Sequence, residues 1–254
     1  MRYTDLVFDL YGTLVDIHTD ENEAVWEKTA LYFGFYGADY SGKSLREAFL
    51  LAMKHREAVA GQNYECFPDI PFEEVLADLF RAKGIHDNAE ALGLNAAQLF
   101  RISSIEYIRV YPHVKEALAT LRAHGFRLWL LSNAQHVFTA YELRLLGLNS
   151  LFDGILLSSD HLCRKPDQRF YQALMEKYDL HPQQCLMIGN DRETDIAGAT
   201  AAGMATLYMH TNLTPSEQTA AMSSRHPRKT SSSPYEYEGA DWLDLTNLII
   251  KMLN

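Results

Sequence analysis

FDLYGTLVD, residues 8 to 16, places an aspartate at the end of an apolar run and a Gly-Thr pair shortly after it. A turn of this kind after a buried strand is typical of a loop that presents a carboxylate, here that of Asp9. A second acid at position 11 would form an acid/base pair with Asp9. Tyr11 stands there instead. The pair is therefore incomplete, and the partners of Asp9 have to come from other parts of the chain.

Short apolar runs recur along the chain, and helical patterns follow them. The runs are LVFDL (6–10), RLWLLS (127–132), GILLS (154–158), CLMIG (185–189) and ATLYM (205–209). Continuous apolar runs of this length are typical of parallel strands that are covered on both faces. Phe138, Tyr141 and Leu145 recur at helical spacing after the second run, and Phe170 and Leu174 do so after the third. This alternation predicts an α/β fold with a doubly wound parallel sheet.

The interval between the first two runs is far longer than a crossover helix needs, and its pattern is helical throughout. Four helices are predicted there, over about 25–36, 45–53, 72–80 and 96–108. We therefore expect a second, smaller all-helical cap domain at 17–108, placed as a lid over the sheet edge where Asp9 emerges. The α/β core domain then comprises 1–16 and 109–254.

The last part of the chain has a different composition. The stretch 211–234 is rich in Ser, Thr and Pro and carries a basic cluster at 225–229, which predicts a solvated loop, with anion binding as the alternative. An edge strand at YEYE (235–238) and a helix over 241–253 are predicted to follow.

Three further polar stretches stand just past predicted strand ends, where open α/β sheets bind their ligands. They contain Ser132 and Asn133, then Lys165, then Asp191 and Asp195. Each stretch alone is weak evidence, because a Ser-Asn pair after a strand is usually a helix cap and a Lys-Pro pair is usually a loop. Their order on successive strand–helix units makes them a candidate site.

With the turn at Asp9, these stretches make the chain resemble the haloacid dehalogenase (HAD) superfamily of hydrolases with an aspartate nucleophile. That superfamily shows an Asp turn after its first strand, a Ser or Thr after the second, then a Lys and an acidic pair. The resemblance covers 1–16 and 110–210 as the core, and the helical insertion matches the superfamily's cap. It implies a HAD/Rossmann-like core, is specific for fold and nucleophile, and says little about substrate.

The resemblance assigns roles near the first two strand ends. Asp9 would attack the electrophile and form a covalent intermediate, which divides one hard displacement into two easier ones. Gly12 would let the backbone approach closely, and the Thr13 hydroxyl would hold the carboxylate. Ser132 would donate a hydrogen bond to a substrate oxygen, with Asn133 beside it.

The later motifs imply a charged centre. Lys165 would balance the charge between the nucleophile and an anionic substrate. Asp9, Asp191 and Asp195 would hold Mg²⁺ together with the main-chain carbonyl of Tyr11, since Mg²⁺ prefers oxygen ligands. Three carboxylates against one ammonium leave two negative charges, which a divalent cation neutralises.

The acidic motif admits two alignments. Asn190 can be its first metal-side residue, because the superfamily's spacing varies here. We place Asp191 there, since it leaves a three-residue gap to Asp195 that one variant of the superfamily shows.

Tyr11 bears on the reaction. Phosphatases of the superfamily carry there an acid that protonates the departing alkoxide, worth about 10²- to 10⁴-fold. The Asp-x-Tyr-Gly-Thr form resembles instead the 2-haloacid dehalogenases, in which halide leaves unprotonated. Tyr171, after Lys165, also matches their pattern and is expected, with Tyr11, to contact the substrate, as Gly12 and Asn133 are.

Those dehalogenases are metal-free and carry Ser and Asn where this chain has Gly189 and Asp191. A magnesium-dependent hydrolase whose leaving group needs little protonation satisfies both observations, on an acyl, aryl or enol phosphate or a phosphonate-type substrate. Alternatively, water or a cap residue replaces the acid on ordinary phosphate esters. A metal-free 2-haloacid dehalogenase and a catalytically idle relative that only binds its ligand stay open as competing functions.

The overall composition and net charge limit the classes of partner that the protein can have. A net charge of −10 disfavours a general nucleic-acid binder, and a small anionic metabolite is the expected partner. Three scattered cysteines do not form a disulfide or zinc pattern. No run is long and apolar enough for a membrane span or a signal peptide, so we expect a cytoplasmic protein, monomeric or homodimeric, with no membrane partner.

Overall fold

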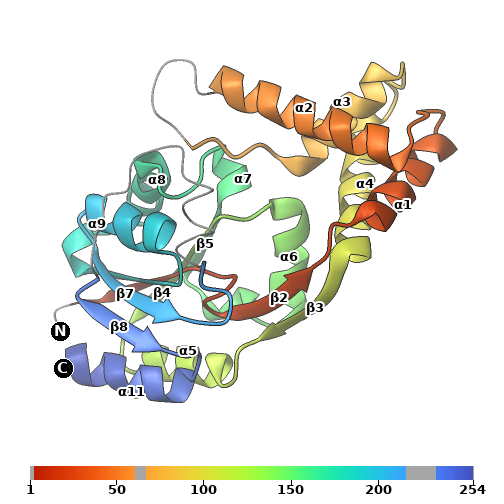
Figure 1. Ribbon diagram of the computed structural model, residues 1–254. Coiled ribbons are helices and arrows are strands. Elements are labelled where there is room, and N and C mark those ends of the chain that lie inside the picture. Colours follow the sequence, from red (N-terminus) through yellow and green to blue (C-terminus); the bar gives the residue numbers. More distant parts are fainter. Residues whose placement is uncertain (1–2, 61–66, 216–232, 254) are drawn as a thin grey trace.

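The computed structural model describes residues 3–60, 67–215 and 233–253 (Figure 1). Its centre is a six-stranded parallel sheet in the order β5-β4-β1-β6-β7-β8. The strands are β1 (Asp5–Phe8), β4 (Arg127–Ser132), β5 (Gly154–Leu157), β6 (Cys185–Gly189), β7 (Ala205–His210) and β8 (Tyr235–Glu238). The predicted doubly wound sheet is confirmed, and YEYE is its edge strand, as expected from the sequence.

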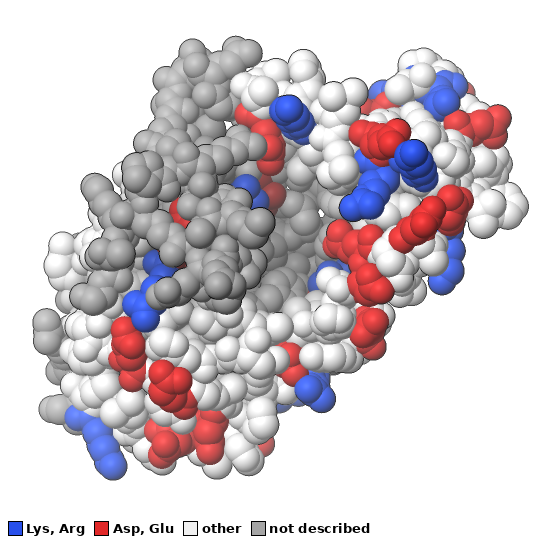
Figure 2. Space-filling view, viewed as in Figure 1, with Lys and Arg blue, Asp and Glu red and all other residues white. Residues whose placement is uncertain are grey.

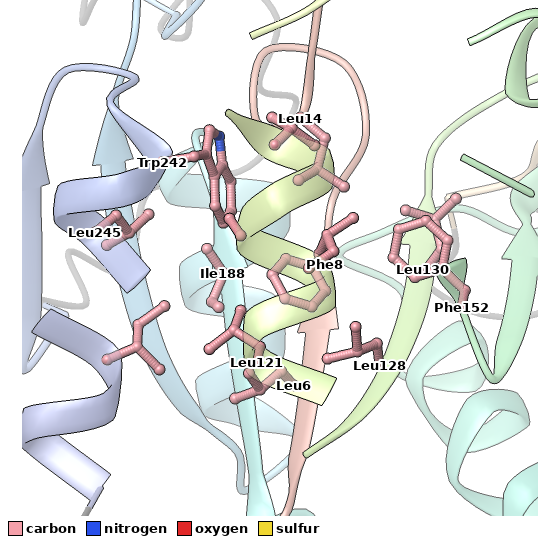
Figure 3. Packing of buried hydrophobic residues seen from close by; sticks show 14 of the residues in the cluster. Leu6, Phe8, Leu14, Leu121, Leu128, Leu130, Phe152, Ile188, Trp242 and Leu245 are labelled. Carbon is pink, nitrogen blue, oxygen red and sulfur yellow. The ribbon is translucent and has the colours of Figure 1, made fainter. Parts of the chain in front are cut away.

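Side chains of β1 alternate between two apolar clusters, one on each face of the sheet. Leu6 and Phe8 join the cluster that α5 (Val114–Ala123) and α11 (Trp242–Leu253) cover, where Phe8 lies 5.9 Å from the ring of Trp242 (Figure 3). Val7 joins the other cluster, beneath α8 (Gln168–Tyr178) and α9 (Gly198–Ala201). Both faces of the sheet are therefore covered by helices, which explains the continuous apolar runs.

The remaining short elements of the core join these layers. They are α6 (His136–Leu145), α7 (Ser158–His161) and the short helices η1 (Asn149–Leu151), η2 (Pro182–Gln184) and η3 (Arg192–Ala197). The helix α6 ends before Gly147, whose φ of +66° breaks the helical conformation. The helices α6 and η3 both begin after strands that flank β1, so their N-terminal ends lie at the edge from which Asp9 emerges.

Four helices between the first and second strands of the sheet form a cluster of their own, which we call the cap helices. They are α1 (Glu23–Phe35), α2 (Gly42–Ala60), α3 (Phe72–Ala82) and α4 (Ala89–Ser104). Their apolar side chains pack together, and the rings of Phe33 and Phe80 stack at 3.8 Å. Two partly buried residues of α6, Val137 and Phe138, pack against this cluster, so the cap helices rest on the core there.

The prediction of a helix over 96–108 is wrong at its C-terminal end. The chain leaves α4 at Ser104 and forms β3 (Ile105–Val110), which pairs antiparallel with β2 (Val15–Thr19). This two-stranded ribbon connects the cap helices to the core (Figure 1). From Tyr107 to Val110 exposed and half-buried residues of β3 alternate, as expected for a strand.

The ribbon also holds a buried carboxylate. Asp16 accepts hydrogen bonds from Arg109 at 2.9 and 2.7 Å and from Asn212 at 3.0 Å. The ribbon crosses the predicted boundaries at 16/17 and 108/109, so the division into a cap domain and a core domain stays a prediction.

Among the residues that the structure describes, no helix combines the length and apolar character that a membrane span requires. The basic cluster at 225–229 lies outside the described residues. On the face in Figure 2, the described Lys and Arg side chains are scattered among Asp and Glu side chains.

Candidate active site

Asp9 stands at the carboxyl end of β1, between β4 and β6. Its backbone N–H donates to the carbonyl of Ile188 at 3.0 Å, which extends the parallel pairing by one residue. Its side chain is 11% exposed. The Thr13 hydroxyl lies 3.3 Å from Asp9 Oδ2, so the turn orients the carboxylate of its own first residue.

The turn after Asp9 needs glycine at position 12 for two reasons. Gly12 has a φ of +84°, where other residues are strained. A Cβ there would lie 2.3 Å from the side-chain nitrogen of Asn190. The close approach predicted for Gly12 is therefore an approach to a neighbouring side chain of the protein.

Asn190 is buried beside the turn at 9–13, which we call the nucleophile turn after the predicted role of Asp9. Its Oδ1 accepts from the Thr13 hydroxyl at 3.2 Å, and its Nδ2 donates to the carbonyl of Leu213 at 3.1 Å. The same hydroxyl thus lies within reach of both Asp9 and Asn190. The two alignments of the acidic motif begin at Asn190 and at Asp191. These contacts place Asn190, the first residue after Gly189, next to Asp9.

Lys165 is the buried cation of the site. Its Nζ lies 2.7 Å from Asp9 Oδ1 and 2.6 Å from Asp195 Oδ1. Burial disfavours the charged ammonium, but the carboxylates of Asp195 and Asp9 outweigh this effect and raise the pKa of Lys165. One ammonium thus serves two carboxylates that are themselves almost completely buried.

Asn133 fixes the backbone of Lys165. Its Oδ1 accepts from the Lys165 N–H at 2.8 Å, and its Nδ2 donates to the Lys165 carbonyl at 3.0 Å. Ser132, the last residue of β4, is buried at the same strand end. Asn133 therefore acts on the position of Lys165, whereas the sequence predicted a substrate contact for it.

Asp195 and Asp191 are placed differently from one another. Asp195 uses Oδ1 for Lys165 and Oδ2 for the Asp191 N–H, at 3.0 Å. Asp191 Oδ1 caps η3 by accepting from the N–H groups of Glu193 and Thr194. Burial raises the pKa of the Asp195 carboxyl to about 7, with Asp9 and Asp191 adding repulsion and Lys165 opposing it.

The oxygen atoms of these side chains are possible ligands of a metal ion. Within the described parts of the chain, no three His, Cys, Asp or Glu side chains form a metal-holding group. Oxygen donors nonetheless converge on the nucleophile turn, since Asp9 and Asn190 share the Thr13 hydroxyl. The carboxylates of Asp9, Asp191 and Asp195 also influence one another electrostatically, and Lys165 neutralises only one of their charges. Hard oxygen donors with surplus negative charge suit a divalent cation.

Tyr171 lies in the apolar layer beneath α8. It is completely buried, and its hydroxyl donates to the carbonyl of Thr194 at 2.5 Å. Its ring stands against Gly198, where a Cβ would lie 2.7 Å from the hydroxyl. This placement supports η3, which carries Asp195, and differs from the predicted substrate contact.

The side chain of Tyr11 turns towards α6. Its hydroxyl donates to Glu142 through a short hydrogen bond and lies 2.9 Å from the Thr139 hydroxyl. Glu142 also accepts from Arg101 of α4, at 2.6 and 3.1 Å. Burial and the Glu142 carboxylate raise the pKa of Tyr11 well above its ordinary value. The phenol therefore remains protonated, and its proton is committed to Glu142.

A cavity of about 390 Å³ lies between the cap helices and the core. Its lining includes Tyr11 and Asn133 from the nucleophile edge, Arg101 from α4, and Asp69 and Arg164 from loops. In Figure 2 the surface is hollowed between the two parts of the molecule. A volume of this size suits a small metabolite.

One loop closes the cavity from the cap side. The Phe67 carbonyl accepts from the Arg164 N–H at 2.9 Å, and the Asp69 N–H donates to the Leu162 carbonyl at 3.2 Å. The Asp69 carboxylate accepts from Ser158 at 2.5 Å and from Gln135 at 2.8 Å. The backbone of 67–69 is thus tied to the loop that precedes Lys165.

A second segment, 211–214, packs against the nucleophile turn, although its composition predicted a solvated loop. The Thr211 hydroxyl donates to the Gly12 carbonyl at 2.6 Å, and Leu213 accepts from Asn190. Residues 216–232 of that predicted loop lie outside the described residues.

Sequence reasoning missed Glu142, Arg101, Asp69 and Arg164. No local signal marks Glu142 and Arg101, since they come from helices far apart in the chain and each reads as an ordinary helix-surface charge. Arg164 could have been noticed as the neighbour of Lys165.

Comparisons with known proteins agree with this geometry. Residues 6–203 match the haloacid dehalogenase-like hydrolase family, described as hydrolases. A glyceraldehyde 3-phosphate phosphatase of Methanothermobacter thermautotrophicus is 30% identical over 111 residues, which cover 44% of this chain and 49% of that protein. A phosphoglycolate phosphatase of Nitrosospira multiformis is 40% identical over 96 residues, covering 37% and 41%. The matched stretches span about half, or less, of these relatives.

Solved structures share the fold over almost the whole chain. A HAD phosphatase from Thermococcus onnurineus has a TM-score of 0.54 at 19% identity and covers 97% of both chains. An L-2-haloacid dehalogenase has a TM-score of 0.54 at 22% identity, covering 98% of this chain and 100% of the other. The chain belongs to the haloacid dehalogenase-like hydrolase family, as the order of its motifs predicted.

Proposed function

We propose that the protein hydrolyses the phosphoryl group of a small anionic metabolite, with Asp9 as nucleophile and Mg²⁺ as cofactor. The observation that carries this proposal is the buried Lys165 ammonium between Asp9 and Asp195. A cation fixed against the nucleophile lowers the repulsion between a carboxylate and an anionic substrate. The phosphatase names of the relatives favour a phosphoryl group over a carbon–halogen bond.

The chemistry follows from the nucleophile. An Asp9 oxygen forms a bond to phosphorus, and the bond to the leaving oxygen breaks with its electron pair going to that oxygen. Water then attacks the phosphorus of the acyl phosphate, which returns Asp9 as a carboxylate and releases inorganic phosphate. Lys165 holds Asp9 in place during both steps, while Thr13 orients the other carboxylate oxygen.

Mg²⁺ would be held at the nucleophile turn. Asp9, the Tyr11 carbonyl and the Asn190 amide oxygen form the donor set that we favour, with Asp191 contributing charge from the cap of η3. When bound, the ion supplies positive charge that stabilises the developing negative charge on the phosphoryl oxygens. We assign Asp195 to positioning Lys165 in place of the predicted metal ligation, because its two oxygens already accept from Lys165 and Asp191.

The preferred substrate depends on whether the leaving group receives a proton. The Tyr11 hydroxyl donates its hydrogen bond to Glu142, so position 11 supplies no acid to the substrate. Substrates with leaving groups that depart without a proton, such as acyl, aryl or enol phosphates, therefore fit best.

A substrate panel tests this function. The wild-type protein would be given acetyl phosphate, p-nitrophenyl phosphate, an alkyl phosphate and 2-chloropropionate, each with and without Mg²⁺. We expect phosphate release that requires Mg²⁺ and is faster for the first two compounds than for the alkyl ester. Chloride release without metal would replace the proposal with a haloacid dehalogenase, which the tyrosine at position 11 favours. Binding without turnover of any compound would indicate an idle relative.

A further inference from the structure

Two arginines line the cavity, and their surroundings differ. Arg101 donates two hydrogen bonds to Glu142, at 2.6 and 3.1 Å, so a carboxylate of the protein already neutralises its charge. Arg164 is exposed on the cavity wall. In the described part of the chain, no hydrogen bond or ion pair involves its guanidinium group.

The backbone of Arg164 is nevertheless fixed. Its N–H donates to the Phe67 carbonyl at 2.9 Å, and its carbonyl accepts from the Asp167 N–H at 2.9 Å. The nearest charge of opposite sign on the cavity wall, Asp69, interacts with Arg164 electrostatically but accepts its hydrogen bonds from Ser158 and Gln135. The backbone of Arg164 is thus fixed, while none of the described residues accepts a hydrogen bond from its guanidinium group.

Arg164 and Lys165 are neighbours in one loop, but their side chains lie in different surroundings. Lys165 is buried and contacts Asp9, whereas Arg164 faces the cavity. Tyr11, which follows Asp9 in the turn after β1, and Asn133, which holds the backbone of Lys165, line the same cavity as Arg164. One small molecule in this cavity can therefore reach from the turn after β1 to Arg164. Guanidinium groups bind carboxylate or phosphate through two parallel hydrogen bonds.

We propose that Arg164 is a specificity-determining residue that binds a second anionic group of the substrate, a carboxylate or a second phosphate. This inference rests on the proposed function for the first group, the phosphoryl group at Asp9. The substrate class is then a small phosphorylated compound with an anion at its other end.

Binding to a protein that cannot turn over its ligand tests this directly. Phosphoglycolate, ethylene glycol bisphosphate and ethyl phosphate would be titrated calorimetrically into the Asp9→Asn protein with Mg²⁺, alone and combined with Arg164→Gln. Ethyl phosphate is the matched ligand: a methyl group replaces the carboxylate of phosphoglycolate, and a hydrogen atom replaces the second phosphate group of ethylene glycol bisphosphate. We expect Arg164→Gln to weaken the binding of at least one of the two ligands with a second anionic group about 10-fold, and the binding of ethyl phosphate less than about 2-fold. Which of the two ligands is affected distinguishes carboxylate from phosphate.

Two further variants complete the test. Arg164→Lys keeps the charge without the planar fork and is expected to restore only part of the affinity. Arg46→Gln removes an exposed arginine of α2 away from the cavity lining and is expected to change no affinity. An equal loss for all three ligands in Arg164→Gln, or no loss for either of the two ligands with a second anionic group, would overturn the inference. Failure of the wild type to release phosphate would refute the proposed function, while these titrations still decide the role of Arg164.

Discussion

Two buried groups of charges lie on either side of the nucleophile turn. At Lys165, one ammonium contacts the two carboxylates of Asp9 and Asp195, so negative charge is in excess. Between α4 and α6, Arg101 and Glu142 balance each other, and Tyr11 adds a neutral donor. A balanced buried pair secures the contact between cap helices and core, whereas an unbalanced one costs stability and favours binding of a cation. The difference separates the proposed catalytic centre from a structural contact.

The largest expected effect concerns the unbalanced centre. Asp9→Asn keeps the size of the side chain and removes the nucleophile, so we expect phosphate release to fall about 10⁴-fold or more. The variant also removes one of the two carboxylates around Lys165, and its free energy of unfolding without metal should not decrease. Urea denaturation and a phosphate-release assay measure both quantities. Retained activity would remove Asp9 from the mechanism.

The second prediction concerns the contribution of Lys165 to the free energy of unfolding. Lys165→Met leaves Asp9 and Asp195 buried without a cation, and we expect the free energy of unfolding to fall by about 3–5 kcal/mol. Adding Asp195→Asn should recover part of this loss, because one of the uncompensated charges is then removed. Lys43→Met, at an exposed position of α2, serves as the matched control in urea denaturation. Equal stability of Lys165→Met and the control would contradict the charge argument.

A smaller effect is expected at the contact of Tyr11 with the Arg101–Glu142 pair. Tyr11→Phe deletes only the hydroxyl that donates to Glu142, and we expect a loss of about 1 kcal/mol in unfolding free energy. Since we assign this hydroxyl no role in proton transfer, kcat should change less than about 3-fold. Tyr141→Phe, at an exposed tyrosine of α6, is the control. A large loss of kcat in Tyr11→Phe alone would show that the phenol takes part in the chemistry.

The smallest effect concerns pH and the β2–β3 ribbon. Burial opposes ionisation of Asp16, but hydrogen bonds from Asn212 and Arg109 hold its pKa below the ordinary 3.8. Because the folded pKa is lower, the contribution to stability is complete well above 3.8 and is lost as pH falls through the folded pKa. Asp16→Asn should therefore flatten the acid limb of the stability profile, by less than about 1 kcal/mol. Asp39→Asn, at an exposed carboxyl, should leave the limb unchanged.

The sequence predicted the parts of the site that depend on strand ends. Asp9 and Lys165 lie where the apolar runs and the helices after them place polar residues, and the parallel sheet brings their side chains together. The contact of Tyr11 with Glu142 and Arg101 could not be predicted, because it requires the approach of α4 to α6, which no local pattern specifies. The ribbon was missed because IEYIRV follows a helix without a turn signal.

The ambiguity at Asn190 and Asp191 has a similar origin. Spacing alone allowed either residue to face the nucleophile, and only the tertiary contacts of the Asn190 side chain with Thr13 and Leu213 distinguish them. The place of Asp69 in the site could not be predicted either, since the loop at 67–69 reaches the core only in the folded chain.

Trapping the covalent intermediate tests the central claim most directly. The wild-type protein would be mixed with acetyl phosphate and Mg²⁺, quenched in acid within the first turnover, digested and analysed by mass spectrometry. We expect a peptide containing Asp9 to carry one phosphoryl group when Mg²⁺ is present and none after chelation. A phosphoryl group on another residue, or an ester on Asp9 formed from 2-chloropropionate without metal, would contradict the account.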